Sequence, residues 1–236
     1  ATRGYMVDKS SDIGYIELRT FSQKAGHDIE TEVLSLADQG MKGLILDLRY
    51  NGGGLVTQAV EVAGKFIPSG AVMHVQGRDG QKKTLYTTGR RITDVPIVVL
   101  VNEYTASASE IVSGALQDTK VATVVGVPTF GKGLVQTLFP LSDGSGLAVT
   151  TQIYLTAGGR QITPDSPIKP DVEVEPLTPE ELEKIKNEQA KRGGPAGPVT
   201  AEDLLRIDPA LDPQLRRALE ILTDQIESRR VGRNAA

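Results

Sequence analysis

Residues 96–111 read PIVVLVNEYTASASEI, and this stretch decides the fold class. Its first six residues, 96–101, are apolar on both faces of a strand. This pattern is typical of the centre of a parallel sheet that helices cover on both sides. From about Ser107 to Leu116 the apolar spacing becomes helical. A buried strand that leads directly into a helix predicts an α/β domain.

The same alternation of short strands and amphipathic helices extends on both sides of this stretch. Asp79-Gly80 is a turn signal between two of the strands, and residues 142–146, SDGSG, join two more. Hairpins interleaved with strand–helix units predict a sheet with mixed pairing. We predict helices at residues 26–39 and 56–66 and strands at residues 13–18, 44–48, 72–76, 83–87, 121–125, 134–138 and 147–156.

The chain divides into two regions by composition. Residues 1–176 form the predicted core domain, and residues 177–236 form a helical extension with a Gly/Pro-rich linker at 193–199. The extension opens on Thr178 and Glu181, which have the spacing of a capping box and predict a helix start.

The final predicted helix begins at Asp212-Pro213, and its apolar side chains lie on one stripe. This stripe docks either on the core domain or on a second copy of the chain, which would make a homodimer. Its members are Leu215, Ala218, Leu219, Leu222 and Ile226.

Composition excludes several classes of function. The 236 residues contain no cysteine, so disulfides and thiol catalysis are excluded. The two histidines, His27 and His74, cannot by themselves build a structural zinc site. The net charge of −4 is spread along the chain, without the basic face that nucleic acid requires, and no apolar run approaches a membrane span. We therefore expect no metal, cofactor, nucleic-acid partner or membrane span.

Ser107 has two interpretations. With Glu110 three residues later, it forms a capping box for the helix that follows. A serine at a strand-to-helix turn can also act as a nucleophile, because the backbone N–H groups and the dipole of the helix start favour an oxyanion. The residues alone leave both interpretations open.

A serine nucleophile needs a base to remove its proton, and neither histidine has a persuasive setting. Lys132 lies between Gly131 and Gly133, which let the backbone approach other segments closely. Burial beside apolar neighbours favours the free amine of a lysine and would make Lys132 a general base. The alternative is a surface lysine in a Gly-rich hairpin. In a regular strand Gln136 shares a face with Lys132 and can orient its amine, or it makes an ordinary strand hydrogen bond.

The segment Asn51-Gly52-Gly53-Gly54 follows a buried strand and precedes a helix. It is either a flexible turn or a set of backbone N–H groups that face an acyl oxygen, since the phosphate-binding pattern G-x-x-x-x-G-K-[ST] is absent. Ser166 and Lys169 match the S-x-x-K motif, but that motif works on a helix, which Pro167 and Pro170 disfavour.

Three separated motifs occur in one order along the chain. They are LDLRYNGGG at 46–54, NEYTASASEI at 102–111 and TFGKGLVQ at 129–136. The set resembles the carboxyl-terminal processing proteases, also called tail-specific proteases, over about residues 13–174, and residues 212–222 resemble the terminal helix of that family. The resemblance implies a crotonase/ClpP-like α/β core with a mixed sheet, flanking helices and a cap made from N- and C-terminal segments, with residues 1–20 in the cap.

The resemblance also assigns a role to each candidate residue. It implies a hydroxyl nucleophile, an amine that acts as general base, and an amide that orients this amine. These three roles fall to Ser107, Lys132 and Gln136 in that order. The oxyanion hole would consist of the backbone N–H of Ala108 and that of Gly53 or Gly54.

The implied function is that of a serine endopeptidase that cleaves proteins near their C-termini through an acyl-enzyme. Its partners would be protein or peptide substrates with free C-termini. It would act outside the cytoplasm, in the bacterial periplasm or cell envelope, although residues 1–5 do not read as a signal peptide. The family usually carries a PDZ domain before a segment like residues 5–18, so we expect a core without that domain. Two rival functions are a crotonase-like acyl-CoA enzyme and a non-catalytic scaffold, or pseudo-protease.

Overall fold

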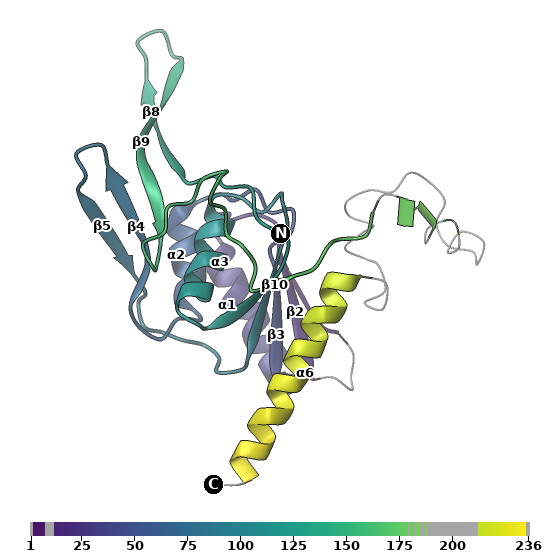
Figure 1. Ribbon diagram of the computed structural model, residues 1–236. Helices are drawn as coiled ribbons and strands as arrows, with labels where there is room; N and C mark the ends of the chain where they lie inside the picture. The colour runs from purple at the N-terminus through teal and green to yellow at the C-terminus, as the bar shows by residue number, and fades with distance from the viewer. Residues whose placement is uncertain are drawn as a thin grey trace.

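The computed structural model describes residues 2–7, 12–178 and 212–234, together with residues 180, 181, 183, 184 and 187. Within these residues the chain forms two β-sheets, and helices cover the larger sheet on both faces (Figure 1). This is an α/β fold, as the sequence predicts.

The larger sheet has six strands in the order β1-β2-β3-β6-β7-β10. β1 pairs with β2 in the antiparallel sense, and the other neighbouring strands pair in parallel. The carboxyl ends of the parallel strands therefore share one edge of the sheet. The strands are β1 Thr2–Met6, β2 Ile13–Leu18, β3 Gly43–Asp47, β6 Ile97–Val101, β7 Ala122–Gly126 and β10 Val172–Glu173.

Side chains of the central strands alternate between two buried cores, one on each face of the larger sheet. In β6, Ile97, Val99 and Val101 belong to the core shared with α1, α2 and α3, whereas Val98 and Leu100 belong to the core shared with α6. None of these five side chains is more than 2% exposed, which explains why residues 97–101 are apolar without interruption. The helices are α1 Ala25–Asp38, α2 Val56–Gly64, α3 Ala108–Asp118 and α6 Pro213–Asn234.

Helix α6 lies across the second face of the larger sheet (Figure 1). Leu215, Ala218 and Leu222 are buried against the sheet, and Leu219 and Ile226 are partly buried beside them. The apolar stripe therefore packs on the sheet of its own chain, which is the first of the two arrangements that the sequence leaves open.

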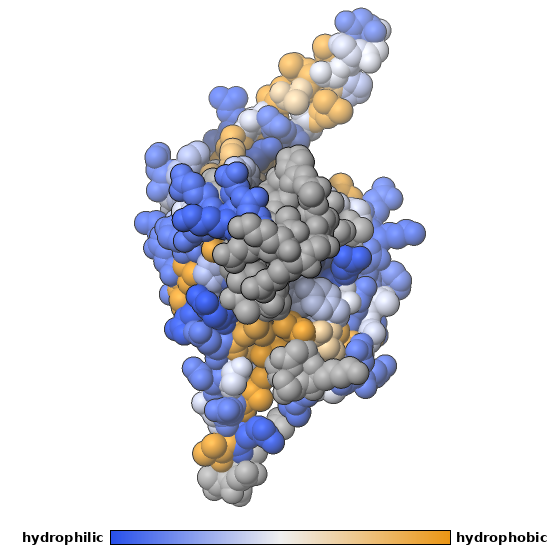
Figure 2. All heavy atoms as spheres, turned by 90° about the vertical axis from the view of Figure 1, so that its right-hand side faces the viewer, coloured by the Kyte–Doolittle hydropathy of each residue, from blue (hydrophilic) through white to orange (hydrophobic). Residues whose placement is uncertain are grey.

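The smaller sheet is antiparallel, with the strand order β5-β4-β9-β8. Its two hairpins, β4/β5 and β8/β9, project beyond the helices toward the upper left of Figure 1. The β8/β9 hairpin exposes apolar side chains: Leu138 is 70% exposed and Leu147 is 51% exposed. Apolar residues lie along this hairpin, which is at the top of Figure 2. The strands are β4 Ala71–Gly77, β5 Lys82–Tyr86, β8 Leu134–Pro140 and β9 Gly146–Thr156.

The strands and helices predicted between residues 13 and 156 are present, with bounds that differ by a few residues. The N-terminal segment, predicted to belong to a cap, forms β1 and β2 of the larger sheet. The capping box is confirmed, because Thr178 N–H donates to Glu181 Oε2 at 2.8 Å and Glu181 N–H donates to Thr178 Oγ1 at 3.2 Å. The predicted linker at 193–199 lies outside the described residues. In the described part of the chain, no helix combines the length and apolar character that a membrane crossing needs.

The docking of α6 can be tested through Leu222, which is fully buried against the sheet. Leu222→Ala should lower the free energy of unfolding by about 2–4 kcal/mol, because it leaves a cavity under the helix. Glu227→Ala, at an exposed position of α6, is the control and should change this free energy by less than about 0.5 kcal/mol. Urea unfolding followed by circular dichroism measures both. Equal stability of Leu222→Ala and the wild type would contradict the docking.

Candidate active site

The loops that follow the parallel strands meet at one edge of the larger sheet. β3, β6 and β7 each lead into one of the three sequence motifs. Backbone hydrogen bonds join these loops: the Asn51 carbonyl accepts the Ala106 N–H at 3.0 Å, and the Thr105 carbonyl accepts the Phe130 N–H at 3.0 Å. The motifs therefore converge at the carboxyl edge, which is where open α/β sheets bind ligands.

Ser107 occupies the turn between β6 and α3 and is half-buried. Its backbone has φ +57° and ψ −115°, a conformation that residues other than glycine rarely adopt. Such strain persists only where the surrounding structure imposes it, and it concentrates at functional sites. Because Ser107 directly precedes the first residue of α3, it also lies at the positive end of the helix dipole.

Glu110 holds this turn in place. Its side chain is 0% exposed, and its carboxylate accepts four hydrogen bonds. Oε2 accepts the N–H of Ser107 and the N–H of Lys132, both at 2.8 Å. Oε1 accepts the Thr129 hydroxyl at 2.6 Å and the Gly131 N–H at 2.7 Å. A carboxylate has about four acceptor sites, so uncharged donors satisfy this one completely.

Glu110 thereby links the loops that carry Ser107 and Lys132. Since one oxygen binds both N–H groups, the two backbone nitrogens lie no more than twice 2.8 Å apart. The capping-box interpretation of Ser107 is confirmed by the bond from its N–H to Glu110. The same carboxylate also binds residues 129–132, so the cap and the proposed catalytic pair are parts of one arrangement.

The glycines on either side of Lys132 allow close packing of its backbone. A β-carbon added to Gly131 would collide with the Thr163 carbonyl, and one added to Gly133 would collide with the Ile162 carbonyl. This confirms the close approach predicted from the sequence. Of the two settings that the sequence leaves open for Lys132, the structure has the surface one, because this residue is exposed. Packing and hydrogen bonding involve its backbone and leave the side chain at the surface.

An open cavity of about 520 Å³ lies beside this turn. Tyr104, Phe130 and Leu134 give it a mostly apolar wall. Lys132 also lines it and is the one charged side chain among the described residues that do so. Ala106, the residue before Ser107, reaches the same cavity. The cavity therefore offers an apolar side chain a place beside the candidate nucleophile and base.

Of the two candidate oxyanion glycines, Gly53 lies against Ser107. A β-carbon built on Gly53 would lie 2.9 Å from the Ser107 Cβ and 3.0 Å from the Ala108 nitrogen. A β-carbon on Gly54 would instead meet the Phe21 backbone. Gly53 also has φ +104°, which side-chain-bearing residues rarely adopt, so glycine is needed at this position.

Asn51 fixes the loop that carries Gly53. Its side-chain Nδ2 donates to the Leu18 carbonyl at 2.6 Å, and its Oδ1 accepts the Gly53 N–H at 2.9 Å. Its carbonyl accepts the Ala106 N–H at 3.0 Å and the Ser109 hydroxyl at 2.8 Å. The loop is therefore tied to residues on both sides of Ser107.

Gln136 lies near the start of β8 and is exposed. The pairing between β8 and β9 shifts register between Val135 and Gln136, so the ladder is irregular at this residue. The alternation of β8 places Gln136 on the same side of the strand as Leu134, which lines the cavity with Lys132.

Other candidate groups lie apart from this edge or are engaged elsewhere. The ring nitrogens of His74 contact the Thr84 hydroxyl at 2.8 Å and the Ala157 carbonyl at 3.2 Å, which is a structural role. Ser166 and Lys169 lie in a non-helical segment, as the neighbouring prolines predict. The described residues contain no cluster of three or more His, Cys, Asp or Glu side chains that could hold a metal ion.

Sequence reasoning missed residues that join the loops. The Thr129 hydroxyl donates to Glu110 at 2.6 Å and accepts the Ile168 N–H at 3.0 Å. The Asn102 Oδ1 accepts the Tyr50 N–H at 3.0 Å, across two motifs. Both residues belong to the quoted motifs, but no local pattern identifies their partners, because those partners are set by the fold.

The fold is that of an α/β protein whose candidate serine lies at a strand-to-helix turn, on the carboxyl edge of a mostly parallel sheet. The sequence model described as Peptidase family S41 matches residues 12–174, and the chain belongs to this family.

Known relatives agree with this assignment. The carboxyl-terminal-processing protease of Synechocystis sp. is 47% identical over 144 residues, which cover 61% of this chain and 34% of that protein. The carboxy-terminal-processing protease of Bartonella bacilliformis is 36% identical over 236 residues, covering 91% of this chain and 53% of that protein. The solved structure of a photosystem II D1 C-terminal processing protease superimposes with a TM-score of 0.68 and 36% identity, covering 74% of this chain and 48% of the other. The chain thus spans between a third and about half of the length of these relatives.

The role of Glu110 can be tested by Glu110→Gln, which replaces one acceptor oxygen with an amide NH₂ group. Donors that faced this oxygen then lose their acceptor inside the protein, at a cost of about 1–3 kcal/mol each. The free energy of unfolding should therefore fall by roughly 2 kcal/mol or more. Glu103→Gln, at an exposed position of the same loop, should have almost no effect. Urea unfolding distinguishes the two variants. Equal stability of Glu110→Gln and the wild type would show that the four hydrogen bonds to Glu110 do not hold this turn in place.

Proposed function

We propose that this chain carries a serine endopeptidase site that cleaves proteins near their C-termini through an acyl-enzyme. The observation that carries the proposal is the Glu110 carboxylate, which fixes the backbones of Ser107 and Lys132 through one oxygen. Ser107 is the nucleophile, Lys132 is the general base, and Gln136 orients the Lys132 amine. Membership of peptidase family S41 supports this reading.

The first half of the reaction acylates Ser107. Lys132, as the free amine, takes the proton from the Ser107 hydroxyl, and Oγ attacks the scissile carbonyl carbon. The exposed Lys132 side chain turns toward Ser107 for this step. Its four-carbon stem can span the short distance that Glu110 sets between the two backbones. Lys132 then gives the proton to the leaving amine as the C–N bond breaks.

The second half of the reaction releases the product. Lys132 removes a proton from water, whose oxygen attacks the ester carbon of the acyl-enzyme. The C–Oγ bond then breaks, and Ser107 recovers its proton from Lys132. In both halves the negative charge on the carbonyl oxygen rests on backbone N–H groups of Ala108 and Gly53. Gly53 N–H is bound to the Asn51 side chain, so this hydrogen bond must open or be shared when the oxyanion forms.

The apolar cavity supports the choice of substrate. Its wall of Tyr104, Phe130 and Leu134 suits an apolar side chain of an extended polypeptide. We propose unfolded protein tails with free C-termini as substrates, as the names of the relatives suggest. On the resemblance to the family alone, we place the enzyme outside the cytoplasm, with residues 1–176 as the protease core and residues 177–236 as its extension.

Cleavage tests the two central residues. Ser107→Ala and Lys132→Ala should each lower kcat/KM by about 10²–10⁴-fold or more, because each removes a group that moves the proton or forms the acyl-enzyme. The substrate is an unfolded protein with an apolar free tail, and mass spectrometry of the products locates the cleaved bond. Circular dichroism confirms that the variants are folded.

Ser166→Ala and Lys169→Ala are matched controls, because they change a second, exposed Ser/Lys pair without touching the site. Both should cleave like the wild type. Full activity of Lys132→Ala would refute the Ser/Lys mechanism. A wild-type chain that cleaves no substrate would instead favour a scaffold.

A further inference from the structure

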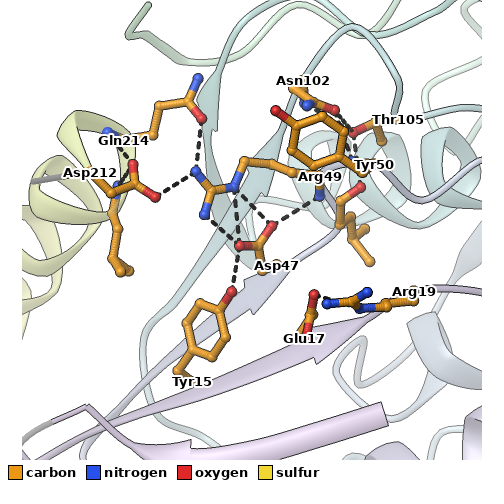
Figure 3. A network of polar contacts seen from close by, with 12 residues as sticks. Tyr15, Glu17, Arg19, Asp47, Arg49, Tyr50, Asn102, Thr105, Asp212 and Gln214 are labelled. Atoms are coloured by element: carbon orange, nitrogen blue, oxygen red, sulfur yellow. Dashed lines mark hydrogen bonds and ion pairs between the residues drawn. The ribbon is translucent and has the colours of Figure 1, made fainter. Parts of the chain in front are cut away.

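A buried arginine joins the C-terminal helix to the loop that carries Gly53. Arg49 is 8% exposed, and its guanidinium lies between Asp47, at the end of β3, and Asp212, at the start of α6 (Figure 3). Nη2 lies 2.7 Å from the Asp47 Oδ2, and Nη1 lies 2.7 Å from the Asp212 Oδ2. Both carboxylates are themselves buried. Two elements far apart in the sequence thus share one charged group.

The charges in this network are mutually dependent. Burial alone would lower the pKa of Arg49, but the carboxylates of Asp47 and Asp212 raise it above its ordinary value. The Tyr15 hydroxyl donates to the Asp47 Oδ2 at 2.6 Å, and burial together with the Asp47 charge raises the pKa of Tyr15. Well-packed apolar side chains often stabilise a core as well as such a network does. The two ion pairs set the position of the Arg49 guanidinium between the end of β3 and the start of α6.

Asp212, which binds Arg49, also caps the start of α6. Asp212 Oδ1 accepts the N–H groups of Gln214 and Leu215, both at 3.0 Å, and so caps the helix, while its Oδ2 binds Arg49. Gln214 Oε1 accepts Arg49 Nη1 at 3.1 Å, and Gln214 Nε2 donates to the Val174 carbonyl at 2.8 Å. One carboxylate, that of Asp212, therefore both caps α6 and binds the guanidinium.

The other end of Arg49 leads into the active-site loop. Its backbone N–H donates to the Asp47 Oδ1 at 2.9 Å. The next residue, Tyr50, has φ +59°, a strained conformation for a residue with a side chain. The residue after that is Asn51, whose carbonyl and side chain make the contacts to Gly53 and to both sides of Ser107 described above.

We propose that α6 is a positioning element of the active site. Asp212 and Gln214 hold Arg49, and Arg49 keeps the loop from Tyr50 to Gly53 in the strained conformation that faces Ser107. Asp212 and Gln214 touch no reacting atom and act through Arg49. The expected effect on rate rests on the proposed function, whereas the expected effect on the loop does not.

The test compares two ways of weakening the attachment of α6. Asp212→Asn keeps the shape and the capping oxygen, since asparagine is a good N-cap, but removes the charge that holds Arg49. Leu222→Ala is the matched control, because it weakens the packing of α6 and removes no hydrogen bond or ion pair of the network. Both are assayed at a temperature where circular dichroism shows them folded. Asp212→Asn should lower kcat at least about tenfold with KM almost unchanged, and Leu222→Ala should keep kcat within about twofold.

A second measurement is independent of activity. Amide hydrogen exchange of Gly53, followed by NMR, should be at least about tenfold faster in Asp212→Asn and unchanged in Leu222→Ala. If the wild type cleaves nothing but Gly53 exchange still rises in Asp212→Asn, the proposed function fails and the loop coupling stands. If folded Asp212→Asn keeps the wild-type kcat, or leaves Gly53 exchange unchanged, the positioning role is overturned. Should Asp212→Asn not fold, Gln214→Met replaces it, because it keeps the helix and removes one contact to Arg49.

Discussion

The four hydrogen bonds to the Glu110 carboxylate are the constraint on which the candidate site depends. They gather donors from the turn after β6 and from the segment after β7 onto one buried acceptor. Without this acceptor, the Thr129 hydroxyl and the Gly131 N–H would be buried unpaired, at about 1–3 kcal/mol each, and the part-buried N–H groups of Ser107 and Lys132 would lose their partner. Because Glu110 lies in the first turn of α3, the packing of α3 against the larger sheet sets the geometry of the site.

The larger sheet adds a second constraint, because its parallel strands all end at the edge where the site lies. Such a sheet must be covered on both faces, so the core needs α6 as well as α1, α2 and α3. Helix α6, which covers the second face, is held at the carboxyl edge of the sheet by the ion pair between Asp212 and Arg49. A helix that the sequence presents as a simple amphipathic stripe is therefore in contact with the residue that begins the active-site loop.

Much of this arrangement can be predicted from the sequence, but only where the signal is local. The strands and helices follow from apolar periodicity, and the bond between Ser107 and Glu110 follows from a spacing of three residues. The bonds from Glu110 to residues 129–132, and from Asp212 to Arg49, join groups far apart in the chain, and pairing of this kind depends on the fold. The sequence leaves the setting of the Lys132 side chain open for a related reason. Flanking glycines signal a close approach of the backbone, and they carry no information about where the side chain goes.

The backbone conformation of Ser107 bears on its two interpretations, as a helix cap and as a nucleophile, in a way that its position in the sequence does not. An N-cap residue ordinarily has extended backbone dihedrals, and these carry no strain. Ser107 instead has φ +57°, while its N–H donates to the Glu110 carboxylate as in a capping box. The cap therefore does not account for the strain. Ala106 N–H is drawn to the Asn51 carbonyl and Ser107 N–H to Glu110, so the backbone reverses at Ser107. The turn at Ser107 lies against Gly53, and strain of this kind concentrates at functional sites.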